Sequence, residues 1–190
     1  MNGIMPFDVI PVATGDVLGF MPSRTATTAA ARSMVGEGGK LREVRVSTYE
    51  TIAPANSFDR WPSGLKQEML DNAFNPVVGS TLVSETDKVR VWHLLIPAGR
   101  RCTFHRHVLD YFWTCHTHGR ARGYYEDGSI TETTHFPGDT KHLTYGKGEH
   151  LVHSVANVGD TDLLFTTVEY LQSANAPLPV PEGVRLKAAA

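Results

Sequence analysis

The feature that most constrains the fold is a run of short alternating segments that fills the second half of the chain. Turn-forming residues separate the segments, as in Pro97-Ala98-Gly99 and Glu126-Asp127-Gly128. Short strands at this spacing are typical of an all-β sandwich or barrel. We therefore predict an antiparallel β domain with strands over residues 88–96, 102–107, 110–118, 120–125, 129–135, 140–145, 150–157 and 162–171.

The chain is predicted to have three parts. Residues 85–172 form the barrel, residues 1–84 form an N-terminal extension that packs on it, and residues 173–190 form a proline-rich surface tail. Within the extension, alanines favour a short helix over residues 25–34. Alternation of apolar and polar residues favours a strand over residues 41–51.

The best predicted helix of the chain covers residues 57–73. Leu65, Met69 and Leu70 form one apolar stripe on it, which indicates packing against the barrel. Pro62 suits a first helical turn, because its missing N–H is not needed there. This extension makes the predicted protein mainly β with a short helix at its N-terminal side.

Composition excludes several classes of function. The net charge is −2 and no run of Lys or Arg stands out, which speaks against a nucleic-acid partner. No apolar run approaches the roughly 20 residues that cross a bilayer, and the N-terminus lacks the features of a secretory signal, so we expect no membrane association. Cys102 and Cys115 are too few for a disulfide framework and are expected as reduced thiols in a cytoplasmic protein.

Two histidines, His105 and His107, stand at the start of an aromatic-rich run. Side chains alternate faces along a strand, so both imidazoles point to the same side and can bind one metal ion. Two ligands make a weak site, and His153 is the candidate for a third. Imidazole suits Zn, Cu, Fe and Ni, so the pair alone does not select the metal.

Residues 97–119 and 153–157 resemble the two signature motifs of the cupin superfamily, especially small cupins such as the β-alanine degradation protein type. The positions that match the motifs are Gly99, His105, His107, Gly119, His153 and Asn157. The resemblance covers about residues 85–172. It implies a jelly-roll antiparallel β-barrel that holds a metal in its interior.

The chain departs from the family motif at its glutamate, where Tyr111 or Phe112 stands and Asp110 comes one position early. Strand alternation from His107 places Tyr111 on the ligand face. We therefore expect a three-histidine site with the Tyr111 hydroxyl near the metal or the substrate. The alternative is a core aromatic residue, and the two interpretations are equally open at this point.

Two more residues share the parity of Tyr111 along the same strand. Trp113 and Cys115 are candidates for the substrate pocket, and the alternative for both is a place in the barrel core. The second His-x-His pair, His116 and His118, faces the opposite side and is expected to be exposed.

The resemblance implies a metal-dependent enzyme that binds a small organic substrate directly at the metal, with an Fe(II) dioxygenase favoured. Zn, Ni and Mn are alternative metals. A redox-neutral lyase, isomerase or decarboxylase is the enzymatic alternative, and a non-catalytic small-molecule-binding cupin is the other. A homodimer is expected, because cupins commonly pair their barrels and exposed sheet edges favour pairing.

Overall fold

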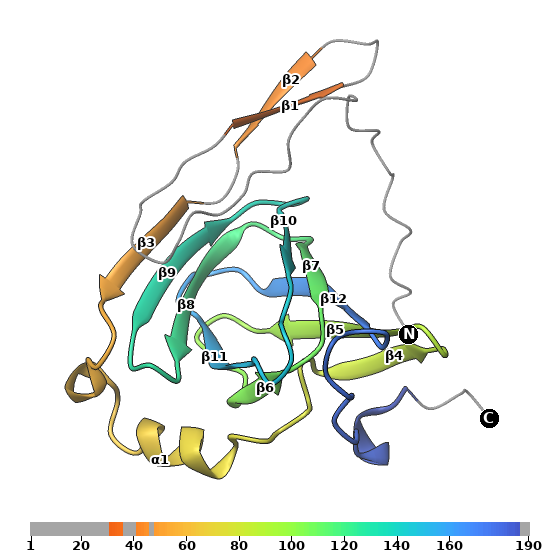
Figure 1. The fold of residues 1–190 in the computed structure, drawn as a ribbon. Coiled ribbons are helices and arrows are strands. Elements are labelled where there is room, and N and C mark those ends of the chain that lie inside the picture. The colour runs from red at the N-terminus through yellow and green to blue at the C-terminus, as the bar shows by residue number, and fades with distance from the viewer. Residues whose placement is uncertain (1–30, 36–40, 46–47, 187–190) are drawn as a thin grey trace.

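The computed structural model describes residues 31–35, 41–45 and 48–186. Two five-stranded antiparallel sheets face each other, as Figure 1 shows. The first sheet has the order β3 (Thr48–Ala53), β9 (Ile130–His135), β8 (Gly119–Tyr125), β11 (Leu151–Asn157) and β6 (His105–His107). The second sheet has the order β10 (Thr140–Leu143), β7 (Tyr111–Cys115), β12 (Leu163–Tyr170), β5 (Val89–Ile96) and β4 (Thr81–Glu85).

The strand order identifies the topology. Of the strands from β5 to β12, the second sheet takes β5, β7, β10 and β12, and the first sheet takes β6, β8, β9 and β11. Dividing eight consecutive strands between two sheets in this way is the arrangement of a jelly roll. The all-β jelly-roll barrel predicted from the sequence is confirmed, and each of its eight predicted strands is present.

The chain before the barrel differs from the prediction in several places. The helix predicted over residues 25–34 is wrong at its end, where strand β1 (Ala31–Val35) pairs with β2 (Leu41–Arg45); residues 25–30 lie outside the described residues. The strand predicted over residues 41–51 is two strands, β2 and β3. Strands β3 and β4 each extend a barrel sheet, by pairing with β9 and β5 respectively. Strand β4 was not predicted.

The helix predicted over residues 57–73 is divided in two. A 3-10 helix covers Phe58–Arg60, and α1 covers Leu65–Asp71. Gly64 separates them with a φ of 80°, a left-handed conformation that glycine adopts easily and that an α-helix does not contain. Pro62 therefore precedes α1 instead of lying in its first turn.

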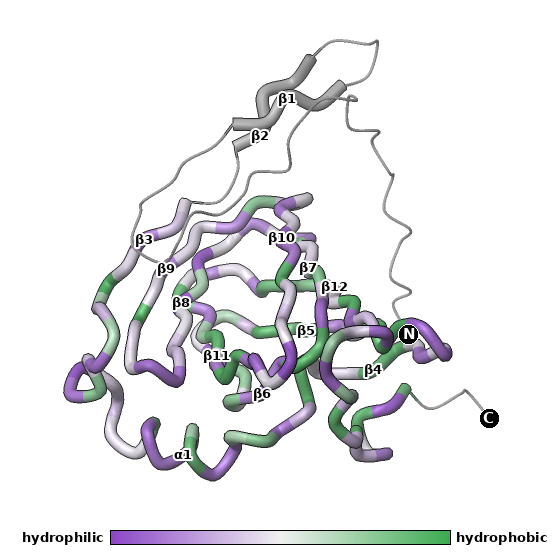
Figure 2. The backbone as a smooth tube through the Cα atoms, in the orientation of Figure 1, coloured by the Kyte–Doolittle hydropathy of each residue, from purple (hydrophilic) through white to green (hydrophobic). Residues whose placement is uncertain are grey.

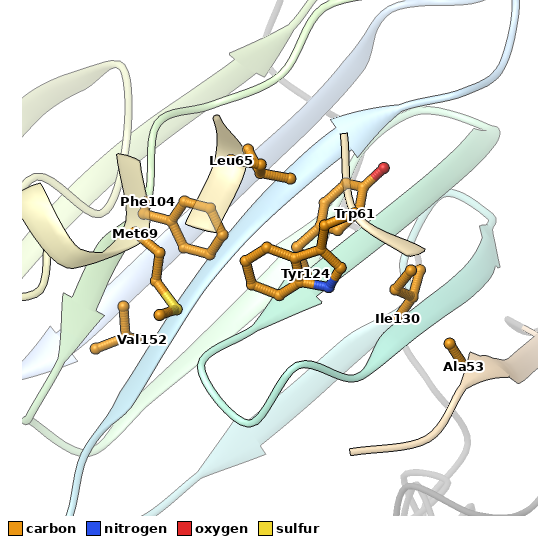
Figure 3. Packing of buried hydrophobic residues seen from close by; sticks show 8 residues of the cluster. All are labelled: Ala53, Trp61, Leu65, Met69, Phe104, Tyr124, Ile130 and Val152. Atoms are coloured by element: carbon orange, nitrogen blue, oxygen red, sulfur yellow. The ribbon is translucent and has the colours of Figure 1, made fainter. Parts of the chain in front are cut away.

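Helix α1 packs on the outer face of the first sheet (Figure 3). Leu65 and Met69 are buried there, while Leu70 from the predicted stripe is 56% exposed, because it lies off the face that positions i and i+4 share. The complete cluster comprises Ala53, Trp61, Leu65, Met69, Phe104, Tyr124, Ile130 and Val152. Since these side chains cover the outer face, the inner face of the same strands is left to line the barrel.

The C-terminal segment docks on the edge of the second sheet. The Leu186 N–H donates to the Leu82 carbonyl at 2.9 Å, and Val180 and Val184 pack on the buried cluster around Trp92. Figure 2 shows that the barrel strands carry both hydrophilic and hydrophobic residues. Among the described residues, no helix has the length and apolar character needed to cross a membrane.

Candidate metal centre

Three histidines converge inside the barrel from neighbouring strands of the first sheet. His105 and His107 lie on one face of β6, and His153 lies opposite His105 in the antiparallel β6–β11 pair. The Nε2 atoms of His107 and His153 are 3.1 Å apart. One ring nitrogen from each histidine lies within 4.8 Å of the other two. The third ligand that the His-x-His pair requires is therefore supplied by His153.

The spacing of the nitrogens fits a single transition-metal ion. A metal–nitrogen bond of about 2.0–2.1 Å places two neighbouring imidazole nitrogens roughly 3.0–3.4 Å apart. The 3.1 Å between His107 and His153 lies in that range. A set of three imidazoles suits a divalent transition metal, and it does not by itself distinguish iron from zinc or nickel.

Burial keeps the imidazoles neutral and available as ligands. His105 and His107 are 2% and 3% exposed. Burial lowers the pKa of His105 to about 4. Burial, followed by the neighbouring histidines, holds the pKa of His107 well below its ordinary value. His105 Nδ1 lies 2.9 Å from the Thr103 carbonyl, to which it donates, so its Nε2 keeps a lone pair for a metal.

Tyr111 lies directly against the cluster. Its ring stacks on His107 with a centroid distance of 4.1 Å and an interplanar angle of 13°. Burial, and then the neighbouring Tyr145, raise the pKa of the Tyr111 hydroxyl well above its ordinary value. The ring of Tyr111 lies beside a candidate ligand for a reason other than strand parity: the chain crosses to the second sheet after His107, and Tyr111 faces the interior from there. The place of its hydroxyl near the metal or the substrate stays a prediction.

The two pocket candidates beyond Tyr111 have different surroundings. Trp113 lines the cavity beside the histidines. Cys115 is fully buried in a core cluster with Ile96 and Leu163, its Sγ donates to the Thr117 carbonyl at 3.1 Å, and it is not part of the cavity wall. The pocket prediction for Cys115 is therefore corrected, because its face is the interior one but packed side chains fill that end of the barrel.

The cavity at the cluster encloses about 180 Å³. Pockets for drug-sized ligands measure about 300–1,000 Å³, so this one suits a smaller molecule. Its polar wall residues other than the three histidines and Tyr111 are Tyr49, Tyr125, Thr131, Thr133, His135, Lys141 and Thr167. Sequence reasoning missed these residues as site residues, because alternation marks half of every strand as interior and does not say which interior positions meet at one cavity.

Of the remaining histidines, His135 lines the cavity without joining the ligand cluster, and the following three lie apart from it. His116 Nε2 lies 2.8 Å from the Thr166 hydroxyl, and His118 is exposed. His150 Nε2 lies 3.2 Å from a Glu126 carboxylate oxygen. Within the described part of the chain, His105, His107 and His153 are the one group of three or more potential ligands that converge. The second His-x-His pair does not converge with a third ligand there. His118 is exposed as expected, whereas His116 is half-buried.

An ion pair ties α1 to the strands that carry the ligands. Arg101 bonds to Glu68 of α1 and donates to the Ser154 hydroxyl at 2.8 Å, next to His153. Hydrogen bonding to Arg101 lowers the pKa of Glu68. The Glu68 carboxylate also accepts from the Phe104 N–H at 3.5 Å, next to His105. Helix α1 is therefore connected to residues that are adjacent in sequence to two of the candidate ligands.

Comparisons with known proteins follow this geometry. No family model matches the sequence. No curated protein matches it either. Among solved structures, the chain is similar to a cupin domain from Bordetella pertussis Tohama I, with 26% identity and a TM-score of 0.40 over 46% of this chain and 85% of that chain.

Two further structures are similar at lower identity. One is an RmlC-like cupin family protein with a double-stranded β-helix fold from Methanocaldococcus jannaschii, at 18% identity and a TM-score of 0.38 over 50% of this chain and 76% of that one. The other is a conserved protein with a double-stranded β-helix domain from Klebsiella pneumoniae. It has 22% identity and a TM-score of 0.39 over 67% of this chain and 93% of that chain. The fold of this chain rests on its own strand order, and its histidine cluster is consistent with a metal-binding cupin.

Proposed function

We propose that this protein is a metal-dependent enzyme that holds one divalent transition metal through His105, His107 and His153. The observation that carries the proposal is the convergence of three imidazoles at the wall of a cavity. Structural zinc sites are closed by four protein ligands, whereas catalytic sites have three and leave a position open. Within the described residues no fourth His, Cys, Asp or Glu joins this cluster.

We propose oxidation of a small organic substrate by O₂ as the reaction and Fe(II) as the native metal. When bound, the iron would supply open coordination positions and redox chemistry. The neutral three-histidine set suits iron, and the resemblance to cupins with such sites favours an oxygenase.

The chain's own residues would position the substrate. Tyr111 is the proposed catalytic residue, because it faces the cavity beside His107 and its raised pKa keeps the phenol protonated at neutral pH. A protonated phenol donates a hydrogen bond to a substrate oxygen. The apolar walls from Leu143, Leu151 and Phe165 limit the water that reaches the substrate.

The metal content of purified protein, measured by mass spectrometry after anaerobic reconstitution with Fe(II), tests the site. We expect about one metal per chain in the wild type and none in His153→Ala, since a two-imidazole site is weak. His142→Ala is the matched control, because His142 is exposed and outside the cluster. Folded wild-type protein that binds no metal, or a His153→Ala variant that binds it equally well, would contradict the site.

Uptake of O₂ by the iron-loaded protein in the presence of candidate small organic acids and diketones tests the reaction class. We expect uptake that depends on substrate and is reduced in Tyr111→Phe. Conversion of a substrate without O₂ uptake would replace the oxygenase by a redox-neutral lyase, isomerase or decarboxylase. Binding without conversion of any kind would favour a non-catalytic cupin.

A further inference from the structure

We propose that the ligand of this cavity is a small organic dianion, with one acidic end at the metal and a second anionic group at Lys141. This inference rests on the proposed metal site and names the class of molecule that the site accepts. The second anionic group is a carboxylate or a phosphate, both of which a lysine recognises as a point charge.

The charge distribution of the cavity wall is the first support. Among the described residues that line it, none is Asp or Glu, and Lys141 is the one Lys or Arg side chain. Imidazole ligands carry no charge when they bind a metal, so a bound divalent metal would keep its full positive charge. The carboxyl groups of Asp139, beside His135, and Glu169, opposite Tyr111, are buried and are not part of the cavity wall. The metal and Lys141 would therefore be the positive centres of the wall, and in a partly desolvated site such centres favour a ligand of opposite charge.

The position of Lys141 is the second support. Strand β10 pairs with β7 so that Lys141 lies opposite Trp113 and Leu143 lies opposite Tyr111. Cross-strand partners share a face, so Lys141 faces the interior with Trp113. Tyr111 stacks on His107. Lys141 lies two residues along β10 from the position opposite Tyr111, which corresponds to roughly 7 Å between the Cα atoms. A ligand held at both ends must also fit a cavity of about 180 Å³, which favours a short carbon chain between its two acidic groups.

His135 supplies a third, independent observation at the same end of the cavity. Its side chain is 6% exposed, lines the cavity and meets the edge of Trp113 with a centroid distance of 5.3 Å. Its Nδ1 makes no hydrogen bond within the described part of the chain and lies 3.9 Å from an Asp139 oxygen. A buried polar ring without a hydrogen bond at one nitrogen is unusual in a core and is typical of a binding site.

The test uses 2-hydroxy acids that share one chelating end and differ at the other. Malate and 2-hydroxyglutarate carry a distal carboxylate, 2-hydroxybutyrate and 2-hydroxypentanoate carry a methyl group instead, and 3-phosphoglycerate carries a distal phosphate. Calorimetric titration of zinc-loaded protein gives each dissociation constant without turnover. We expect at least one dianion to bind about ten- to a hundredfold more tightly than its monoacid partner, as one charge-assisted hydrogen bond implies.

Variants assign the discrimination to Lys141. Lys141→Met should lower the affinity for the dianion to about that of the monoacid, whereas Lys141→Arg should retain a preference for the dianion. Lys147→Met is the matched control. Lys147 lies close to Lys141 in the sequence, but it is exposed and outside the cavity. Circular dichroism of each variant verifies that the fold is retained.

The outcomes separate this inference from the metal site. If the protein binds zinc but does not prefer any dianion, or if the preference survives Lys141→Met, the inference is overturned and the metal site stands. If the protein binds no zinc, the metal site fails. In that case the metal-free protein is titrated with the same acids, and a dianion preference that Lys141→Met removes would still support the anionic subsite, while its absence would overturn it.

Discussion

A buried carboxyl on the interior face of β12 should make a contribution to stability that is lost as the pH rises. Glu169 is 4% exposed and accepts a hydrogen bond from Trp92 Nε1 at 2.8 Å. Strand pairing places it opposite Arg90 on one side and Tyr111 on the other. Arg90 is itself engaged by Glu85 at 2.7 Å, so its charge is shared between two carboxyl groups.

Burial raises the pKa of Glu169 from its ordinary value of 4.5 to about 7, and it outweighs the opposing effects of Trp92 and Arg90. The native state then holds a proton that the unfolded chain has already released between these two values. The contribution of Glu169 to stability is therefore lost as the pH rises from about 4.5 to about 7, whereas the buried histidines, with their lowered pKa values, act in the opposite direction in wild type and variant alike. At 1.36 kcal/mol for each factor of ten in proton affinity, the Glu169 contribution changes by about 2–3 kcal/mol between pH 5 and pH 8.

The substitution Glu169→Gln removes the charge and keeps an oxygen that accepts from Trp92. We expect the variant to gain about 2–3 kcal/mol relative to the wild type when the pH is raised from 5 to 8. The free energy of unfolding of both proteins is measured by urea denaturation at each pH, with EDTA present to remove metal. Glu182→Gln, whose side chain is 89% exposed, is the control and should follow the wild type. If the free energies of unfolding of the wild type and Glu169→Gln differ by the same amount at pH 5 and at pH 8, the reasoning is refuted.

Two further predictions concern packing and thiol reactivity. Leu65→Ala, at a position 4% exposed under α1, should reduce the free energy of unfolding by about 2–5 kcal/mol, whereas Leu70→Ala, at a position 56% exposed, should change it by less than about 0.5 kcal/mol. Equal effects in urea denaturation would contradict the docking of α1 described above. Burial raises the pKa of the Cys115 thiol to about 11, so iodoacetamide at pH 8 should label it slowly in the native protein and quickly in urea. Peptide mass spectrometry measures both rates, and rapid native labelling would show that this end of the barrel is open.

Much of the fold could be predicted because the signals are local. Turn residues mark the ends of the strands, and Gly128, with a φ of 85°, stands where the β8–β9 hairpin needs a left-handed residue. The His-x-His spacing places two ligands on one face whatever the strand pairs with. The predicted helix was too long, because apolar residues occur both before and after Gly64 and suggested one continuous helix. The left-handed backbone at Gly64 interrupts it.

The candidate site could be predicted only in part. His105, His107 and Tyr111 lie close together in the sequence, while His135 and Lys141 reach the same cavity from strands whose partners no local pattern reveals. The parity argument placed Tyr111 on the interior face, where it lies, although the chain changes sheets before it. The same argument failed for Cys115, because parity selects a face and not a depth along the barrel.

The sequence by itself determined that this chain is an all-β domain with an interior histidine pair, because strand period, turn chemistry and ligand spacing act over a few residues. Only the tertiary structure decided which strands pair, that β3 and β4 join the barrel sheets, and that the cavity wall holds one lysine and no carboxylate among the described residues. Those features depend on contacts between residues far apart in the chain. Their formation is governed by the packing of whole sheets against each other, which no single segment specifies.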